Sequence, residues 1–289
     1  MKCMKKWFAL LTACLVLALT LTACTAAPAT SDKTAAPAND QTAVPANEGT
    51  EQTDWDYISG KGTLVIGYTV YEPMNYPDET GKLVGFDTEF AEALCEKLGV
   101  TPEFVEIDWD SKELELSSKK IDCIWNGLTV SEKRRANMDF SSSYLKNEQT
   151  VVIRTADAEK FVDLASFDGA SVVAEEGSAG AATIEADMPS AAFTGVLAQS
   201  DALLEVKAGT ADAAVIDVTM ANAMVGEGTD YADLMIVTGI DLMDEEYAVG
   251  FRLGSDVTAK ANEAISALLS DGTLKALAEK YDLSDLLIG

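Results

Sequence analysis

The sequence predicts an α/β protein of two lobes, each built around an open and largely parallel β-sheet. Short apolar runs alternate with amphipathic segments along the chain, which is typical of strands that alternate with helices. Two distant stretches, at residues 120–126 and 210–217, share one layout: a polar turn, an aspartate and an apolar strand that ends on a polar residue. About 230 residues remain once the N-terminal segments are set aside, which is enough for two such units.

Residues 1–23 are predicted to be a lipoprotein signal peptide. Three lysines near the start are followed by an apolar stretch at residues 8–23. The Leu-Thr-Ala-Cys run at residues 21–24 looks like a bacterial lipobox, and cleavage within it would leave Cys24 as a lipid-modified N-terminal residue. A transmembrane anchor is the alternative, but the stretch is short for a span of about 20 residues. We therefore expect an extracytoplasmic protein that is lipid-anchored to the cell membrane.

Residues 24–54 are expected to form the lipidated cysteine and a disordered tether. They repeat alanine, proline and threonine with acidic residues, and they hold few large apolar side chains. Such a segment buries too little apolar surface to offset the entropy of ordering. Folding is expected to resume at Trp55.

Composition limits the partners and the chemistry. The net charge of −27 argues against nucleic acid and anionic lipid headgroups as ligands. The chain has no histidine, which excludes Ser-His-Asp and Cys-His nucleophiles and histidine-ligated metal centres. We expect no cofactor and no metal.

Two of the five cysteines belong to the predicted folded part. Cys3 and Cys14 lie in the signal peptide and Cys24 is the lipidation site, which leaves Cys95 and Cys123. These two could form a disulfide outside the cell. Alternatively they stay free, because one is predicted within a helix and the other within a strand, where buried thiols are common.

The first predicted elements are a strand, a loop and a helix. The strand covers residues 64–67, and the prolines of the aromatic loop at 68–76 keep it from being helical. The helix covers residues 85–99, with Asp87 expected as its N-cap and Gly99 as its stop. Its apolar residues recur at every fourth position, at Phe86, Phe90, Leu94 and Leu98.

The next stretch is the most informative for function. A buried strand at residues 121–125 ends in Asn126 and Gly127, where the backbone can turn sharply and expose amide groups. Thr129 then offers a hydroxyl, and the helix turn after it carries Arg134. An arginine can hold both oxygens of a carboxylate, so this stretch suits a small carboxylate ligand.

These motifs resemble the polar amino-acid-binding subfamily of extracellular solute-binding proteins, family 3, the receptors of ABC importers. The resemblance rests on the Gly-x-Thr step at 127–129, on Arg134, on the Phe-Ser-x-x-Tyr segment at 140–144, and on the Gly-Phe-Asp start of the helix at 85–99. It covers residues 62–283. It implies a two-lobed fold of the type II periplasmic-binding-protein-like kind, with two sheets joined by a hinge of two crossings.

The resemblance also implies how the chain divides between the lobes. Lobe 1 is expected at residues 55–148 and 247–289, and lobe 2 at residues 149–246. Lobe 2 begins near Val152, has a strand near residue 170 followed by a Gly-Ser loop, and continues through a helix and a strand that ends at Asp217. Two final helices complete lobe 1.

Eight residues are expected to contact the ligand by this resemblance. Arg134 would hold the α-carboxylate and Asp217 the α-ammonium, whereas the alternatives are a solvated helix charge and a helix N-cap. The other candidates could instead be turn residues, in the case of Asn126, Gly127 and Thr129, or core residues, in the case of the two aromatic side chains. The full set is Tyr71, Trp109, Asn126, Gly127, Thr129, Arg134, Ser178 and Asp217.

The predicted function is a monomeric receptor that binds a free L-amino acid and delivers it to an ABC permease. The alternative is an enzyme on the same fold, such as a lyase resembling cyclohexadienyl dehydratase, with Glu175 or Glu176 as a general acid. No aspartate stands between Gly67 and Tyr71. The resemblance implies an acid there in relatives that bind cationic or amide side chains. That absence argues against a basic ligand, whereas Glu175 and Glu176 keep one possible.

Overall fold

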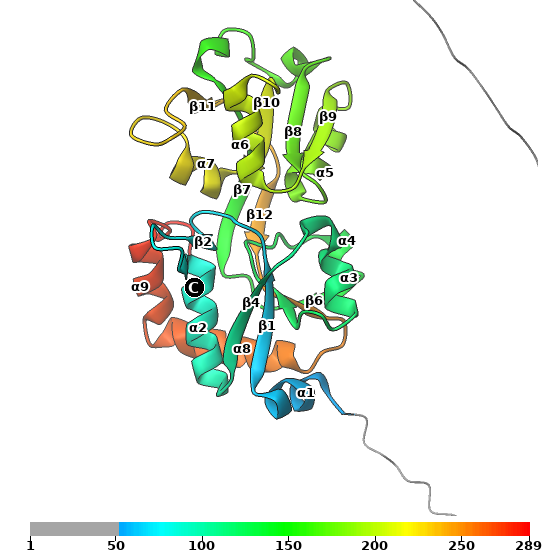
Figure 1. The fold of residues 1–289 in the computed structure, drawn as a ribbon, viewed down its shortest axis with the longest axis vertical. Coiled ribbons are helices and arrows are strands. Elements are labelled where there is room, and N and C mark those ends of the chain that lie inside the picture. The colour runs from blue at the N-terminus through cyan, green and yellow to red at the C-terminus, as the bar shows by residue number, and fades with distance from the viewer. Residues whose placement is uncertain (1–51) are drawn as a thin grey trace, which may run out of the picture. The chain divides into compact units, whose positions relative to one another are not determined.

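The computed structural model describes residues 52–289, which lie within one compact unit, Thr50–Gly289. The predicted signal peptide, Cys24 and almost all of the predicted tether lie outside the described residues. The predicted α/β architecture with two open sheets is confirmed (Figure 1). Along this part of the chain, no helix is both long enough and apolar enough to cross a membrane.

The first sheet contains five strands in the order β4-β1-β5-β13-β6. Strand β1 is parallel to β4 and β5, whereas β13 is antiparallel to β5 and β6. The sheet is therefore mixed rather than largely parallel, because the chain enters it a second time, through β13, from the opposite direction. The strands are β1 Thr63–Tyr68, β4 Thr101–Glu106, β5 Cys123–Ile124, β6 Met138–Phe140 and β13 Gly250–Arg252.

The helices around this sheet come from both ends of the described chain. Helix α2 packs against α8 and α9, which follow the last strand. Asp54, the last residue of the predicted tether, is the first residue of α1. The helices are α1 Asp54–Lys61, α2 Phe86–Leu98, α3 Lys112–Ser117, α4 Glu132–Arg135, α8 Val257–Ser270 and α9 Thr273–Lys280; a 3₁₀ turn, Trp109–Ser111, and a small hairpin, β2 Tyr76–Pro77 with β3 Leu83–Val84, complete the lobe.

Helix α2 does not begin with the cap that the sequence predicts. Its N-cap is Gly85, with φ of 126°, and a Cβ at this position would lie 2.2 Å from the carbonyl oxygen of Met74. Asp87 lies instead in the first turn, where its buried carboxylate accepts hydrogen bonds from Gly127 N (2.7 Å) and Tyr144 Oη (2.9 Å). Asp87, which the sequence predicts to cap its own helix, therefore fixes the distant loop at Gly127.

The second sheet has the order β11-β7-β10-β8-β9, with β12 paired to β7. Strands β8, β9 and β10 are parallel, whereas β7 is antiparallel to β10 and β11. The elements are β7 Leu145–Arg154, β8 Ser171–Glu175, α5 Ala179–Asp187, β9 Ala192–Val196, α6 Gln199–Ala208, β10 Ala213–Asp217, α7 Val218–Met224, β11 Leu234–Ile236 and β12 Asp244–Tyr247, with 3₁₀ turns at Thr155–Asp157 and Leu164–Phe167.

Strand β7 connects the two lobes. Its first residues pair with β12, from Leu145↔Tyr247 to Glu148↔Asp244. From Gln149 onward it pairs with β10 and becomes part of the second sheet. The two segments that pass between the sheets therefore lie side by side as an antiparallel pair (Figure 1).

The two cysteines of the folded part are free. Cys95 lies in α2 and Cys123 in β5, and both are buried in the core of the first lobe. The disulfide alternative is therefore wrong, and burial raises the pKa of the Cys95 thiol to about 12. The aromatic part of this core packs edge to face, with the Phe90 ring 4.8 Å from Trp125 and 5.3 Å from Tyr144.

Candidate functional site

The loop after β5 is held by the side chain of Asn126. Its Oδ1 accepts hydrogen bonds from Thr69 N (3.0 Å) and Thr69 Oγ1 (2.9 Å). Its Nδ2 donates to Thr69 O and to Asn75 Oδ1, both at 2.8 Å. Because an amide side chain has two donor hydrogens and one oxygen with two lone pairs, this group is fully used. Asn126 therefore fixes the neighbouring loop, and only its backbone is left to meet a ligand.

Gly127 occupies a position that only glycine fits. Its φ is 56°, and a Cβ would lie 2.7 Å from the ring of Tyr71. Tyr71 is buried, and its hydroxyl lies 2.7 Å from the hydroxyl of Tyr247 on β12. The Tyr71 ring therefore packs in the core beside the loop. A core position was the alternative to ligand contact in the sequence analysis.

Arg134 is not a solvated helix charge. Its side chain is buried, with the residue only 7% exposed, whereas the neighbouring Arg135 lies largely in solvent. Ser131 caps the short helix α4 by accepting a hydrogen bond from Arg134 N. The guanidinium donates from Nη1 to Thr129 O (2.7 Å) and from Nη2 to Gly177 O (3.4 Å), so it joins the first lobe to the loop after β8.

Asp217 ends β10 and faces three amide side chains. Although it stands at the N-cap position of α7, its carboxylate makes no capping hydrogen bond. It accepts instead from Asn147 Nδ2 (2.6 Å), from Gln149 Nε2 (2.8 Å) and from Gln199 Nε2. Burial raises the pKa of this carboxyl, and the three amides oppose that rise by stabilising the charged form.

Glu245 is a site residue that the sequence reasoning missed. It accepts from Thr129 Oγ1 (3.0 Å), Asn147 Nδ2 (3.0 Å) and Gln149 Nε2 (3.1 Å), so it shares two amides with Asp217. Burial and the charge of Asp217 raise its pKa to about 7. In the sequence it stands within an acidic run that resembles a solvated surface. The sequence signal that could have identified Glu245 is its position on β12, the strand that returns to the first lobe, two residues before Tyr247.

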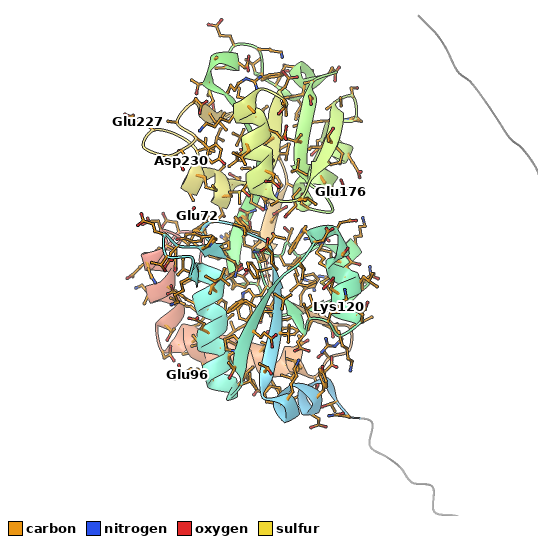
Figure 2. All side chains as sticks on the ribbon, viewed as in Figure 1. Glu72, Glu96, Lys120, Glu176, Glu227 and Asp230 are labelled. Carbon is orange, nitrogen blue, oxygen red and sulfur yellow. The ribbon has the colours of Figure 1, made fainter. Side chains whose placement is uncertain are left out.

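The second lobe contributes Ser178 and Glu175. The Ser178 hydroxyl caps α5 by accepting from Ala181 N (3.0 Å). Glu175 is the last residue of β8, is 3% exposed, and has an Oε1 atom with no hydrogen-bond partner among residues 52–289. Burial raises its pKa to about 8. The adjacent Glu176 is exposed (Figure 2).

Lys112 and Trp109 close this side of the site. The Lys112 Nζ atom donates to Trp109 O (3.0 Å) and to Gly177 O (2.9 Å), which makes a second contact between the lobes. Burial lowers the pKa of this amine to about 8. Trp109 is 4% exposed and has the Lys112 Nζ atom 4.9 Å from its ring centroid.

Most of these residues line one small cavity. Of the eight predicted site residues, only Tyr71 is not part of its lining. The cavity measures about 10 Å³, which is room for about one water molecule. A hollow of about 400 Å³ outside it shares Thr129, Arg134 and Ser178. The lining residues are Trp109, Asn126, Gly127, Thr129, Arg134, Glu175, Ser178, Ala179, Gln199 and Asp217.

Another hollow of similar size lies elsewhere, between the loop at Pro73, helix α7 and helix α9. It contains none of the predicted residues. We place the candidate site at the small cavity because buried charges of both signs converge there.

Comparison with known proteins shows the family to which this chain belongs. The family described as bacterial extracellular solute-binding proteins, family 3, matches residues 64–284. The L-cystine-binding protein TcyJ of Escherichia coli strain K12 is 28% identical over 231 residues, which cover 79% of this chain and 86% of that protein.

Two solved structures have the same fold. A substrate-binding protein of an ABC uptake transporter from Streptococcus pneumoniae, with bound histidine, is 31% identical and has a TM-score of 0.76; the match covers 83% of this chain and 100% of that one. The ancestral amino acid-binding protein AncCDT-1, a precursor of cyclohexadienyl dehydratase, is 28% identical with a TM-score of 0.71 and covers 78% and 98%. The predicted type II two-lobed fold is confirmed.

Proposed function

We propose, because this chain belongs to the bacterial extracellular solute-binding proteins of family 3, that it binds a free L-amino acid between its lobes and delivers it to an ABC permease. One observation carries the proposal. Arg134 of the first lobe and Asp217 of the second line the same cavity, so a cation and an anion face one space from opposite sides. That arrangement matches the two charged ends of an amino-acid zwitterion.

Each end of the zwitterion has a set of partners. The α-carboxylate would lie against the guanidinium of Arg134, which keeps free N–H groups beside those that bind Thr129 and Gly177. The α-ammonium would lie against Asp217. Two of the amides that hold Asp217 also hold Glu245, so a second carboxyl lies near the ammonium.

The site opens when the lobes separate. The cavity of about 10 Å³ is far smaller than an amino acid, so a ligand needs the lobes to move apart before it enters. Two contacts to Gly177 O, from Arg134 and from Lys112, must break for this motion. The antiparallel pair of β7 and β12 supplies the hinge.

Domain boundaries and membrane attachment belong to the same proposal. Lobe 1 comprises residues 55–148 and 247–289, and lobe 2 comprises residues 149–246. The protein acts as a monomer, held near its permease by a lipid on Cys24 and a tether at residues 24–54, which raises its local concentration. If the Cys24→Ala protein still partitions with membranes after signal cleavage, the lipid-anchor part of the proposal is wrong.

The experiment for the receptor role measures binding and compaction together. A panel of L-amino acids is screened by ligand-induced thermal shift, and calorimetry follows on those that stabilise the protein. Small-angle scattering with and without the bound amino acid should show a smaller radius of gyration in the complex, because both lobes contact the ligand only when closed. Tight binding with an unchanged radius would contradict closure around the hinge.

An enzyme on this fold remains the second candidate, and one observation favours it. Glu175 lines the cavity, and burial holds its pKa at about 8, so it carries a proton that a general acid could donate near neutral pH. The likeness to AncCDT-1 concerns a protein described as the precursor of a dehydratase. Recovery of the bound amino acid unchanged after prolonged incubation supports the receptor, whereas conversion to a product supports the enzyme.

A further inference from the structure

We propose that Glu175 binds the ligand side chain and selects amino acids whose side chain carries a positively charged nitrogen group. This inference rests on the proposed receptor function, since it assigns a role within the same cavity. It gives the site a third binding group, in addition to those for the two ends of the zwitterion.

The first step is that Glu175 lacks the partners that the other acids of the site have. Asp217 and Glu245 each accept hydrogen bonds from three side chains. Glu175 is as deeply buried, yet its Oε1 atom has no partner in the described part of the chain. Buried polar atoms in folded proteins are nearly always hydrogen-bonded, so an unpartnered carboxylate oxygen that lines a cavity is a site for a donor from outside the chain.

The second step is that Lys112, the nearby amine, is already engaged. Its Nζ atom donates hydrogen bonds to Trp109 O and to Gly177 O. Trp109 also lines the cavity, but the Lys112 Nζ atom already lies 4.9 Å from its ring centroid. The carboxylate of Glu175 is therefore the group that remains for a cationic side chain.

The third step concerns the proton of Glu175. Burial and the charge of Asp217 raise its pKa, whereas the Thr69 side chain and the charges of Lys112 and Arg134 lower it, and the resulting value is about 8. Without a ligand, the carboxyl is therefore largely protonated at pH 7. A cation placed against it favours the charged form, so the proton leaves to the solvent buffer when the ligand binds. Glutamine or norleucine, which bring no positive side-chain charge, would leave the proton in place.

The acid assigned to the ligand side chain belongs to the second lobe. The chain has no acid between Gly67 and Tyr71 in the first lobe. Glu175 lies on β8 of the second lobe. The acid for the side chain would thus come from the opposite lobe, and selection would be completed on closure.

The test compares matched ligands by calorimetry on the whole protein at pH 7. L-lysine is set against L-norleucine, L-arginine against L-glutamine, and L-cystine is included because its second half carries an ammonium group. Each titration is run in two buffers of different ionisation heat, which reports the protons released. We expect the cationic ligand of a pair to bind at least tenfold more tightly and to release a proton.

Two variants then locate the effect. Glu175→Gln should weaken the cationic ligands at least tenfold, leave the neutral ligands within twofold and abolish the proton release. Glu176→Gln, at the exposed neighbouring position, should leave both classes within twofold. If Glu175→Gln does not fold, the comparison of ligands and proton release in the unmodified protein still decides.

Other outcomes would overturn the inference. The inference is wrong if the neutral ligands bind as tightly as their cationic partners. It is also wrong if Glu175→Gln leaves the binding of the cationic ligands unchanged. In either case, the proposed receptor function still stands if Arg134→Ala abolishes the binding of the amino acid. If no L-amino acid binds at all, the receptor function itself has failed.

Discussion

Asp217 and Glu175 are the last residues of two paired parallel strands, β10 and β8, yet their environments differ. Asp217 is surrounded by amide donors from three residues, whereas Glu175 has an oxygen with no partner among residues 52–289. An acid held by many donors is fixed in place, and those donors favour its charged form, which suits a group that every amino acid carries. An acid left without donors responds to whatever cation the ligand brings. We infer that the first recognises the class of ligand and the second discriminates within it.

The largest expected effect comes from removing the charges that hold the zwitterion. Arg134→Ala or Asp217→Ala should weaken binding of every ligand by about 2–5 kcal/mol, because truncating one partner of a buried pair leaves the other unpaired. Calorimetry on the single variants and the double variant measures this. The two losses should not add, since either one already prevents productive closure.

The control for this experiment is Arg135→Ala, on the exposed side of the same short helix. It should change binding by about 0.5 kcal/mol or less. The contrast between the two acids is wrong if Glu175→Ala weakens the binding of a neutral ligand as much as Asp217→Ala does, because the two acids would then act alike.

A second test concerns Asn126, whose side-chain hydrogen bonds are all made within the protein. It asks whether this residue contributes to stability rather than to ligand selection. Asn126→Ala should lower the free energy of unfolding without ligand by about 2–3 kcal/mol, because groups of Thr69 and Asn75 lose their partners in a buried site. Urea denaturation measures the loss. Asn222→Ala, at an exposed position of α7, should change it by about 0.5 kcal/mol or less. Equal stability of Asn126→Ala and the unmodified protein would show that these hydrogen bonds contribute little.

The third effect is smaller and depends on pH. The folded protein keeps the proton of Glu175 up to a pKa of about 8, above the ordinary glutamate value. The resulting stabilisation is complete below the pKa of the unfolded chain, and it is lost as pH rises toward 8. It changes by at most about 1.4 kcal/mol per pH unit. Asp87 and Glu245, whose pKa values are raised to about 7, act in the same direction.

Unfolding of the ligand-free protein at several pH values between 5 and 8 measures this slope. Glu175→Gln should make the slope shallower, whereas Glu176→Gln should leave it as it is. A slope that Glu175→Gln does not alter would mean that this carboxyl is already charged in the folded protein, and the contrast with Asp217 would disappear.

Strand ends and charges could be predicted from the sequence, whereas their partners could not. An apolar run that ends on a polar residue placed Asn126 and Asp217 at the edge of a sheet, and the spacing of the family motif identified Arg134. The partners come from distant positions, such as Asn147 and Glu245, which are 98 residues apart in sequence. Periodicity within a segment carries no information about such pairs, so Glu245 was missed and Asp87 was misread as a cap.

The same limit explains the error about the sheets. Alternating strands and helices indicate parallel pairing when the chain advances in one direction. Here the chain leaves the first lobe through β7 and returns through β12, and the returning strand β13 is antiparallel to its neighbours. The pattern within each lobe gave no signal of that reversal.

The position of Asn147 and Gln149 on β7 has a consequence for anyone who builds a fluorescent sensor from this protein. These amides hold Asp217, which we propose binds the ammonium group, and they lie on the strand that we propose as part of the hinge. Substitutions along β7 will therefore shift the working concentration range and the amplitude of the optical signal together. Retuning one without the other requires changes away from this strand, and Glu175 at the end of β8 is where we would begin.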